Sequence, residues 1–313
     1  MKKLQITGLK SVIGLLLLEG ALVVCWSSGF VGVRFAIDHA PVFLILLWRS
    51  LVSGLLLLPF ALALGPRLRS KEIVAQAIIG ALAMSGYLAG FAIAIDQGVS
   101  TGLVALIADM LPLAVAMLSI PILGDIVTRG QWFGFIVGFS GVVIASTSAF
   151  QLGNAPVWAY GMPILGMLSL ALATLLQKRT IRLTMPIHQS LCIQCLSAAA
   201  IFAVFAWYEG SVLPVAEPRL AIGVIWLVVL ATFGGYGLYY ICLRKSSAAR
   251  VSSVLYLSPP VTMLWAWTMF NEPMSWMMVI GLVVSLAGIV IASGAEGPEP
   301  CPENQTAEGA VSS

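Results

Sequence analysis

Three ionisable side chains, Glu19, Arg49 and Asp109, lie within long apolar stretches of the sequence. A charged group inside a bilayer costs about 3 kcal/mol on insertion scales, so each is a candidate for substrate or proton chemistry. Arg49 and Asp109 each lie eight residues beyond the start of a predicted span, which places both about 12 Å deep from the same face. The two charges are therefore expected to pair. The pair either fixes helix packing or lines a substrate path.

Glu19 follows four leucines and precedes Gly20. A carboxyl group in apolar surroundings can take up and release a proton when those surroundings change. Glu19 is therefore a candidate proton site. The structural alternative is a side chain that reaches water or a lysine at the cytoplasmic end of its span.

The composition predicts an integral membrane protein. Of the 313 residues, 60% are apolar and 9% are charged, which a soluble surface would not tolerate. The five cysteines form no disulfide or zinc pattern. Nucleophile elbows, metal-binding helices, phosphate loops and dinucleotide fingerprints are all missing from the sequence. We therefore expect no enzyme, cofactor, metal site or nucleic-acid partner.

Apolar runs of roughly 20 residues, the length that spans a bilayer, account for most of the chain. They predict an all-α integral membrane fold with ten transmembrane helices. The predicted spans are 12–33, 41–64, 73–95, 101–123, 131–150, 157–177, 187–208, 220–243, 251–270 and 276–293.

An internal duplication organises these spans. Residues 100–146 align without a gap on residues 247–293, at an offset of 147 (Ser100 onto Ser247). An earlier match has an offset of 145. A gapless register that also reproduces the order of apolar runs indicates two copies of one unit. The paired residues include Pro112 with Pro259, Asp125 with Glu272, Gly134 with Gly281, Arg34 with Arg179, and Pro41 with Pro186.

The positions of the basic residues predict the orientation. With a cytoplasmic amino terminus, every Lys and Arg except Arg34, Arg49 and Arg219 lies in a cytoplasmic segment, as the positive-inside rule requires. Both termini are then cytoplasmic. Five spans are an odd number, so the second copy enters the membrane inverted. We expect one five-helix repeat at 1–150, its inverted copy at 151–294, and a disordered cytoplasmic tail at 295–313.

The duplication identifies counterparts of the buried charges. Arg49 maps onto Gln194 and Asp109 maps onto Tyr256, so the second half carries polar, uncharged groups at the mirrored positions. The four side chains are expected to converge near the pseudo-two-fold axis.

Two prolines and a tryptophan complete the candidate site. Pro112 and Pro259 interrupt the fourth and ninth spans at matching positions, which is typical of a transport site although also of an ordinary membrane kink. We predict that they form gating kinks. Trp26 could stack on a substrate ring, or it packs between helices.

Short motifs recur in a fixed order through both copies. They are Trp26-Ser27-Ser28-Gly29-Phe30, Pro41 with Phe43 and Arg49, Ser100-Thr101, Leu111-Pro112, Ser258-Pro259, Asn271-Glu272-Pro273, and Gly281 with the ending Gly288 to Ser293.

In this order the motifs resemble those of the EamA family of the drug/metabolite transporter superfamily. The resemblance implies ten helices, export of small metabolites or amino acids, and a central cavity formed by the first four spans of each half. The fifth and tenth spans would be peripheral supports. The chain departs from the family pattern in carrying Glu19 and Asp109.

The sequence therefore predicts a multi-pass secondary transporter of the inner (cytoplasmic) membrane. It would export a small-molecule substrate by alternating access, with proton coupling at Glu19. An uptake permease of the same fold and a passive channel remain open, and so does a homodimer. The predicted cavity residues are Trp26, Arg49, Asp109, Gln194 and Tyr256.

Overall fold

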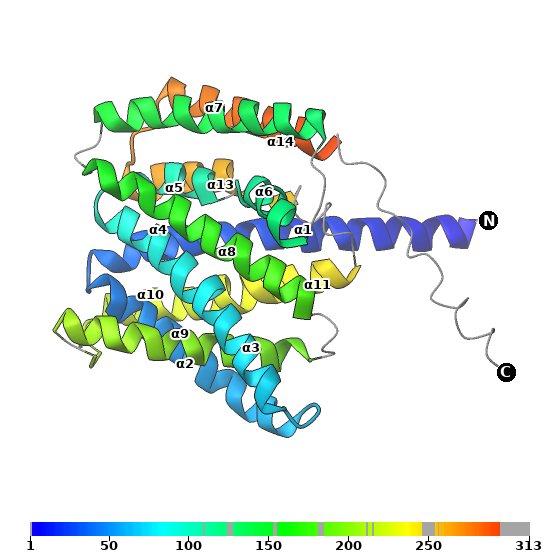
Figure 1. Ribbon diagram of the computed structural model, residues 1–313, viewed down its shortest axis with the longest axis vertical. Coiled ribbons are helices and arrows are strands. Elements are labelled where there is room, and N and C mark those ends of the chain that lie inside the picture. Colours follow the sequence, from blue (N-terminus) through cyan, green and yellow to red (C-terminus); the bar gives the residue numbers. More distant parts are fainter. Residues whose placement is uncertain are drawn as a thin grey trace.

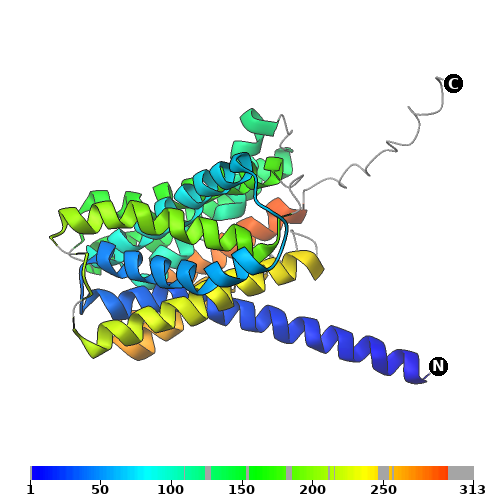
Figure 2. The same ribbon diagram turned by 90° about the horizontal axis from the view of Figure 1, so that it is seen from below.

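The computed structural model describes residues 2–108, 110–123, 128–152, 155–180, 185–210, 212–214, 216–245, 254–255 and 257–294. Within these ranges every regular element is a helix, as the composition predicts. The helices lie side by side in one bundle, from which the amino-terminal part of the first helix projects (Figures 1 and 2).

The first half of the chain forms the helices that correspond to the first five predicted spans. They are α1 (Lys2–Ile37), α2 (Val42–Ala63), the run α3 (Ser70–Gly80), η1 (Ala81–Gly86) and α4 (Tyr87–Asp96), the run α5 (Thr101–Ala108) and α6 (Leu111–Leu123), and α7 (Arg129–Leu152).

The second half forms a matching series. It comprises η2 (Val157–Tyr160) with α8 (Gly161–Thr180), α9 (Ile187–Tyr208), the run α10 (Pro218–Trp226), η3 (Leu227–Tyr236) and α11 (Gly237–Lys245), then α13 (Ser258–Phe270) and α14 (Trp276–Gly294).

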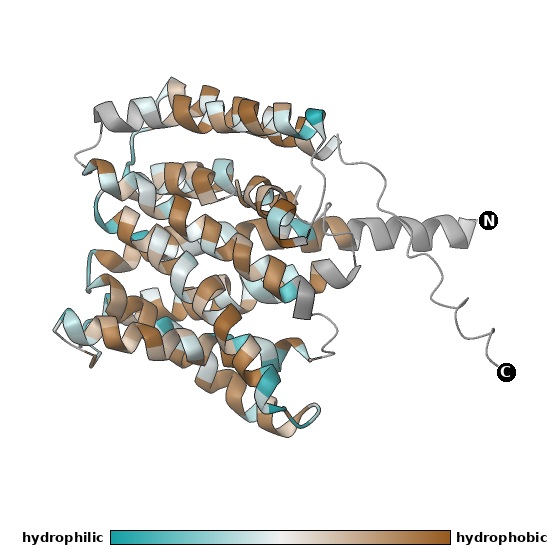
Figure 3. Ribbon diagram, in the orientation of Figure 1, coloured by the Kyte–Doolittle hydropathy of each residue, from teal (hydrophilic) through white to brown (hydrophobic). Residues whose placement is uncertain are grey.

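Seven helices in the described ranges are long and apolar enough to cross a membrane, and they coincide with seven of the predicted spans. Shorter apolar helices occur at Arg129–Ala145 and Trp276–Ala292. Hydrophobic residues line the helices along their length (Figure 3), and large side chains such as Leu62 and Trp276 are exposed. Such a surface suits lipid contact. Ten crossings remain a prediction, because part of the ninth predicted span lies outside the described residues.

Two helices contain a π-helical segment at matching places in the two halves. These segments, η1 and η3, interrupt the third and eighth predicted spans. The hydroxyl of Ser169 donates a hydrogen bond to the Leu82 carbonyl in η1 (2.9 Å), and the hydroxyl of Thr232 donates to the Leu227 carbonyl in η3 (3.0 Å). Leu82 and Leu227 are 145 residues apart, the offset of the earlier repeat match. π-Helical turns occur often at functional sites, and here a carbonyl group of each segment accepts a hydrogen bond from a side-chain hydroxyl.

The fourth predicted span is divided near its middle. Helix α5 ends at Ala108 and α6 begins at Leu111, so Pro112 lies in the first turn of α6. Pro259 likewise lies in the first turn of α13. Proline is tolerated there, because the first N–H groups of a helix have no partner within the helix. The two predicted kink residues thus lie at helix starts, while their role in gating stays a prediction.

Helices α7 and α14 form a pair at one edge of the bundle (Figure 1). Small residues bring their backbones together: a Cβ placed on Gly281 would lie 2.5 Å from the Gly141 carbonyl oxygen, and one on Gly134 would lie 2.6 Å from the Gly288 carbonyl oxygen. Ser285 donates a hydrogen bond to the Gly138 carbonyl at 3.0 Å. This close packing is typical of small-residue motifs between membrane helices.

The close backbone contacts at Gly281 predict that a methyl group added there destabilises the protein. We expect Gly281→Ala to destabilise the protein by about 1–3 kcal/mol, because the new Cβ meets backbone atoms that must move. The measurement is the thermal unfolding midpoint in detergent. Gly20→Ala is the matched control, since a Cβ there meets nothing within 4 Å. Equal midpoints for the two variants would contradict the packing account.

Candidate substrate site

A small pocket lies where α1, α2, α4 and η3 meet. Its volume is about 20 Å³, enough for about one water molecule. Three of these elements come from the first half and one from the second, so the pocket lies between the two copies. The lining residues are Trp26, Gly29, Phe30, Arg49, Tyr87, Leu88, Phe91, Ala231 and Tyr236.

Arg49 supplies the charge of this pocket. Its side chain is 3% exposed, and its Nε donates a hydrogen bond to Thr232 Oγ1 at 3.2 Å. Thr232 in turn donates to the Leu227 carbonyl within η3. The π-helix therefore orients the hydroxyl that accepts from the arginine. Arg49 Nη1 has no hydrogen-bond partner among the described residues.

Aromatic rings form much of the remaining wall. The ring centroids of Trp26 and Tyr236 are 5.3 Å apart, and those of Tyr87 and Phe91 are 5.4 Å apart. Phe30 and Phe91 are also in contact, at 5.0 Å. Aromatic pairs at these distances pack favourably and present a largely apolar surface. The pocket thus combines one buried cation with an apolar wall.

A larger pocket, of about 290 Å³, lies one helical turn further along α1 and α4. Arg34 and Ile95 line the larger pocket. Arg34 lies four residues after Phe30, and Ile95 lies four residues after Phe91, and both phenylalanines line the smaller pocket. The contacting rings of Phe30 and Phe91 therefore lie at the end of the small pocket nearer the larger one. Both rings are almost fully buried. We call the side of the bundle with the larger pocket the Glu272 end.

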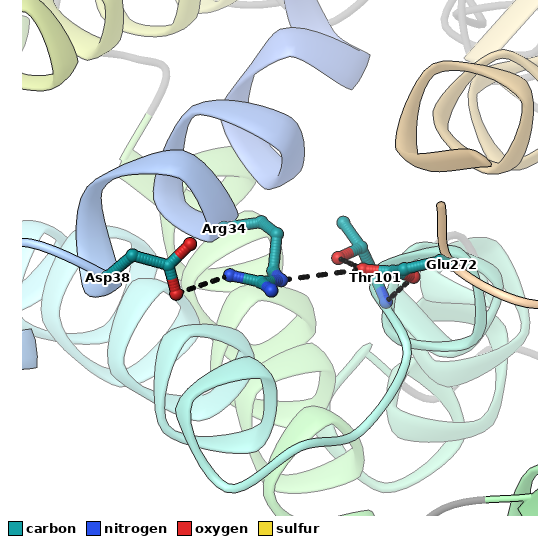
Figure 4. Close-up of polar contacts among 4 residues, drawn as sticks. All are labelled: Arg34, Asp38, Thr101 and Glu272. Carbon is teal, nitrogen blue, oxygen red and sulfur yellow. Dashed lines mark hydrogen bonds and ion pairs between the residues drawn. The ribbon is translucent and has the colours of Figure 1, made fainter. Parts of the chain in front are cut away.

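A polar network holds the Glu272 end together (Figure 4). The Glu272 carboxylate accepts hydrogen bonds from the Thr101 amide (2.8 Å) and hydroxyl (2.5 Å) at the start of α5. Arg34 on α1 pairs with Asp38 at 2.8 Å and lies 3.7 Å from Glu272. Asn271, in the left-handed conformation with φ 52°, ends α13 just before Glu272. The network links α1, α5 and the segment that joins α13 to α14.

A second carboxylate caps a helix of the first half in the same manner. Glu209, which follows α9, accepts a hydrogen bond from the Phe43 amide at the start of α2 (3.1 Å). Partial burial raises the pKa of Glu209, and the Phe43 hydrogen bond opposes that rise. Negative groups stabilise helix amino termini, so both carboxylates fasten segments of the second half onto helices of the first.

The residues predicted from the sequence lie in different places. Trp26 and Arg49 line the small pocket. Gln194 donates instead to the Gln76 side chain at 2.8 Å, in a buried contact between α9 and α3. Glu19 is buried on α1, seven residues before Trp26. Asp109 and Tyr256 lie outside the described residues, so the predicted Arg49–Asp109 pair stays a prediction.

Sequence reasoning did not select Tyr87, Tyr236 and Thr232 for this site. One available signal was a Gly-Tyr pair in each half, Gly86-Tyr87 and Gly235-Tyr236, at the carboxyl ends of the two π-helical segments. The hydroxyl of Thr232 had no comparable signal, because its position depends on the π-helical turn.

Comparison with known proteins identifies the family. The model of the EamA-like transporter family matches residues 10–147 and matches again over residues 157–294. The chain belongs to this family. The two matches, together with the apolar helices, make it a multi-pass membrane protein of a transporter family whose members take small-molecule substrates.

Several relatives match most of the chain. The uncharacterized inner membrane transporter YedA of Escherichia coli K12 is 24% identical over 278 residues, covering 87% of this chain and 88% of YedA. A probable terminal-alkyne amino-acid exporter of Streptantibioticus cattleyicolor is 25% identical over 285 residues, covering 86% and 90% of the two chains. A crystal structure with 16% identity shares the fold, with a TM-score of 0.64 over 89% of this chain and 96% of the other.

The Arg49–Thr232 contact can be tested by removing the hydroxyl. We expect Thr232→Val to lower the free energy of unfolding by about 1–3 kcal/mol, because a buried guanidinium N–H and the Leu227 carbonyl lose a partner. Thr232→Ser keeps the hydroxyl and should stay close to wild type. The measurement is thermal unfolding of the purified protein in detergent. If valine and serine behave alike, the hydrogen bond does not support the site.

Proposed function

We propose that this protein is a secondary transporter that exports small metabolites or amino acids across the cytoplasmic membrane by alternating access. The observation that carries the proposal is the pocket at Arg49. Elements from both halves of the chain line this pocket. A carrier needs such a site between its repeats, so that one side opens while the other stays closed.

The pattern of helix packing supports an inverted repeat. Helix α1 packs on the α10–η3–α11 run and on α13, and its counterpart α8 packs on the α3–η1–α4 run and on α5 and α6. The remaining spans pair with their own counterparts, α2 with α9 and α7 with α14. Exchanging the two halves leaves these contacts unchanged, as a two-fold relation requires, although α1 also packs on α4 and α5 of its own half. With the positive-inside rule, the Glu272 end then faces outward and both termini are cytoplasmic.

The layers at the Glu272 end would act as the outer gate. Substrate leaving the Arg49 pocket outward must pass the Phe30–Phe91 contact and then the polar network of Arg34, Thr101 and Glu272. Each layer is made of residues from different helices. A change in helix packing would therefore separate the residues of both layers at the same time. Pro112 and Pro259, at helix starts in corresponding spans, would be the points at which the helices bend.

Export is the proposed direction because one relative of similar length is named a probable amino-acid exporter. Uptake through the same cavity is the nearest alternative, because the driving gradient sets the direction. A passive channel fits less well, because the pocket at Arg49 holds about 20 Å³ and the Phe30–Phe91 contact blocks the way to the larger pocket.

Glu19 is the proposed proton site. Its side chain is 5% exposed and lies two helical turns, about 10 Å, from Trp26 in the pocket. A buried carboxyl group on a pocket-lining helix can couple its protonation to the opening of that pocket.

Reconstitution in liposomes tests the proposal. We expect saturable counterflow of radiolabelled amino acids or small metabolites in the wild type and in Glu19→Gln, with proton-driven accumulation lost in Glu19→Gln alone. Coupling needs a titrating group, whereas exchange needs only the cavity. Glu217→Gln, at the start of α10, is the matched control and should accumulate substrate as the wild type does. Rapid unsaturated leak would indicate a channel, and intact accumulation in Glu19→Gln would exclude Glu19 as the proton site.

A further inference from the structure

We propose that the Arg49 pocket binds its substrate through a carboxylate group, which accepts hydrogen bonds from the Arg49 guanidinium, while the aromatic wall holds an apolar or aromatic substituent. The substrates would thus be small organic acids with an apolar side chain, such as apolar amino acids. This inference rests on the proposed transport function and specifies its substrate class.

The free donor of Arg49 is the first argument. The side chain is 3% exposed, and its Nε is taken by Thr232. Nη1 has no partner among the described residues. A buried donor of a charged group without a partner destabilises the protein more than a neutral one does. A carboxylate placed at Nη1 would remove that cost, and it would form the short, strong type of hydrogen bond that arginine makes with such groups.

The charge of the pocket is the second argument. The described residues that line it include one cation, Arg49, and no carboxylate. The ion pairs found in the described part of the chain involve Arg34 at the Glu272 end instead. In a low-dielectric interior, a guanidinium with no carboxylate partner among the described residues strongly favours an anion over a neutral or cationic group of the same shape.

The wall of the pocket restricts the rest of the substrate. Trp26, Phe30, Leu88 and Phe91 present mainly ring and aliphatic carbon atoms, and besides Arg49 the polar side-chain groups of the lining residues are the indole N–H of Trp26 and the hydroxyls of Tyr87 and Tyr236. A polyhydroxylated or multiply charged substrate would leave its polar groups without partners there, which burial penalises. An apolar or aromatic substituent can pack against the rings.

The size of the pocket connects this binding to the transport cycle. About 20 Å³ is too small for an amino acid, so α1, α2, α4 and η3 must separate when a substrate enters. Because Arg49 on α2 is bonded to Thr232 on η3, an anion at Nη1 would lie at the contact between the two halves that has to move. Substrate binding and gate movement would then act on the same helices.

The experiment compares acids with amides of the same shape. L-Phenylalanine and L-leucine are tested against L-phenylalaninamide and L-leucinamide, by counterflow in liposomes and by thermal stabilisation in detergent. We expect the acids to exchange and to stabilise the wild type, with the amides at least about tenfold weaker. In Arg49→Gln the concentration of acid for half-maximal effect should rise at least about tenfold, and Arg49→Lys should lie between. The exposed arginine variant Arg219→Gln is the matched control and should match the wild type.

Several results would overturn the anion site. They are equal effects of acids and amides on the wild type, unchanged acid binding in Arg49→Gln, and no stabilisation by either class. Acid binding restored in the double variant Arg49→Gln/Asp109→Asn would also overturn it, because the arginine would then be half of a structural ion pair. Saturable exchange of amides alone would overturn the anion site and leave the transport function standing. Acid-dependent stabilisation without any exchange would keep the anion site and contradict the transport function.

Discussion

A charged guanidinium within an apolar bundle is the constraint around which this structure is arranged. Arg49 lies on a span-length helix and is almost fully buried, so bulk water and lipid headgroups do not reach it. Among the described residues the acceptor for Arg49 is Thr232, which a π-helical turn presents. The rings of Trp26, Tyr87 and Tyr236 enclose the rest of the pocket. The guanidinium is thereby held in place, while its Nη1 has no hydrogen-bond partner among the described residues. This arrangement suits an anion that binds and is then released.

Arg49 and its repeat counterpart Gln194 make different contacts. Arg49 on α2 donates a hydrogen bond to Thr232 on η3, and Gln194 on α9 donates to Gln76 on α3, although the offset of 145 maps Thr232 onto Tyr87. The glutamine pair is neutral and mutually satisfied, and a Cβ on Gly80 would lie 2.5 Å from the Gln194 Cα, so the helices pack tightly there. One copy thus carries the reactive charge and the other a structural contact. A duplicated unit can diverge in this way, because each contact between the halves depends on its own pair of side chains.

The sequence predicted the helical fold well because membrane spans are set by hydropathy and length, which are local properties. Trp26 and Arg49 could be selected because an apolar span makes a charge or a large ring conspicuous. The duplication matched Gln194 to Arg49, whereas the contact of Gln194 with Gln76 depends on the packing of α3 against α9. Tyr87, Tyr236 and Thr232 depend on the π-helical turns, which change helix register without altering hydropathy. The network of Glu272 with Thr101 joins residues 171 positions apart and has no local signature.

The central claim is that the Arg49 pocket opens to one side of the membrane at a time. The most direct measurement is the reaction of a single cysteine, introduced by Ala231→Cys into a chain without native cysteines, with a membrane-impermeant thiol reagent applied from either side. Adding Glu272→Gln weakens the network at the predicted outer end. The account predicts faster reaction from outside and slower reaction from the cytoplasm in that variant. Rates that rise together from both sides, or that do not change, would contradict alternating access at this site.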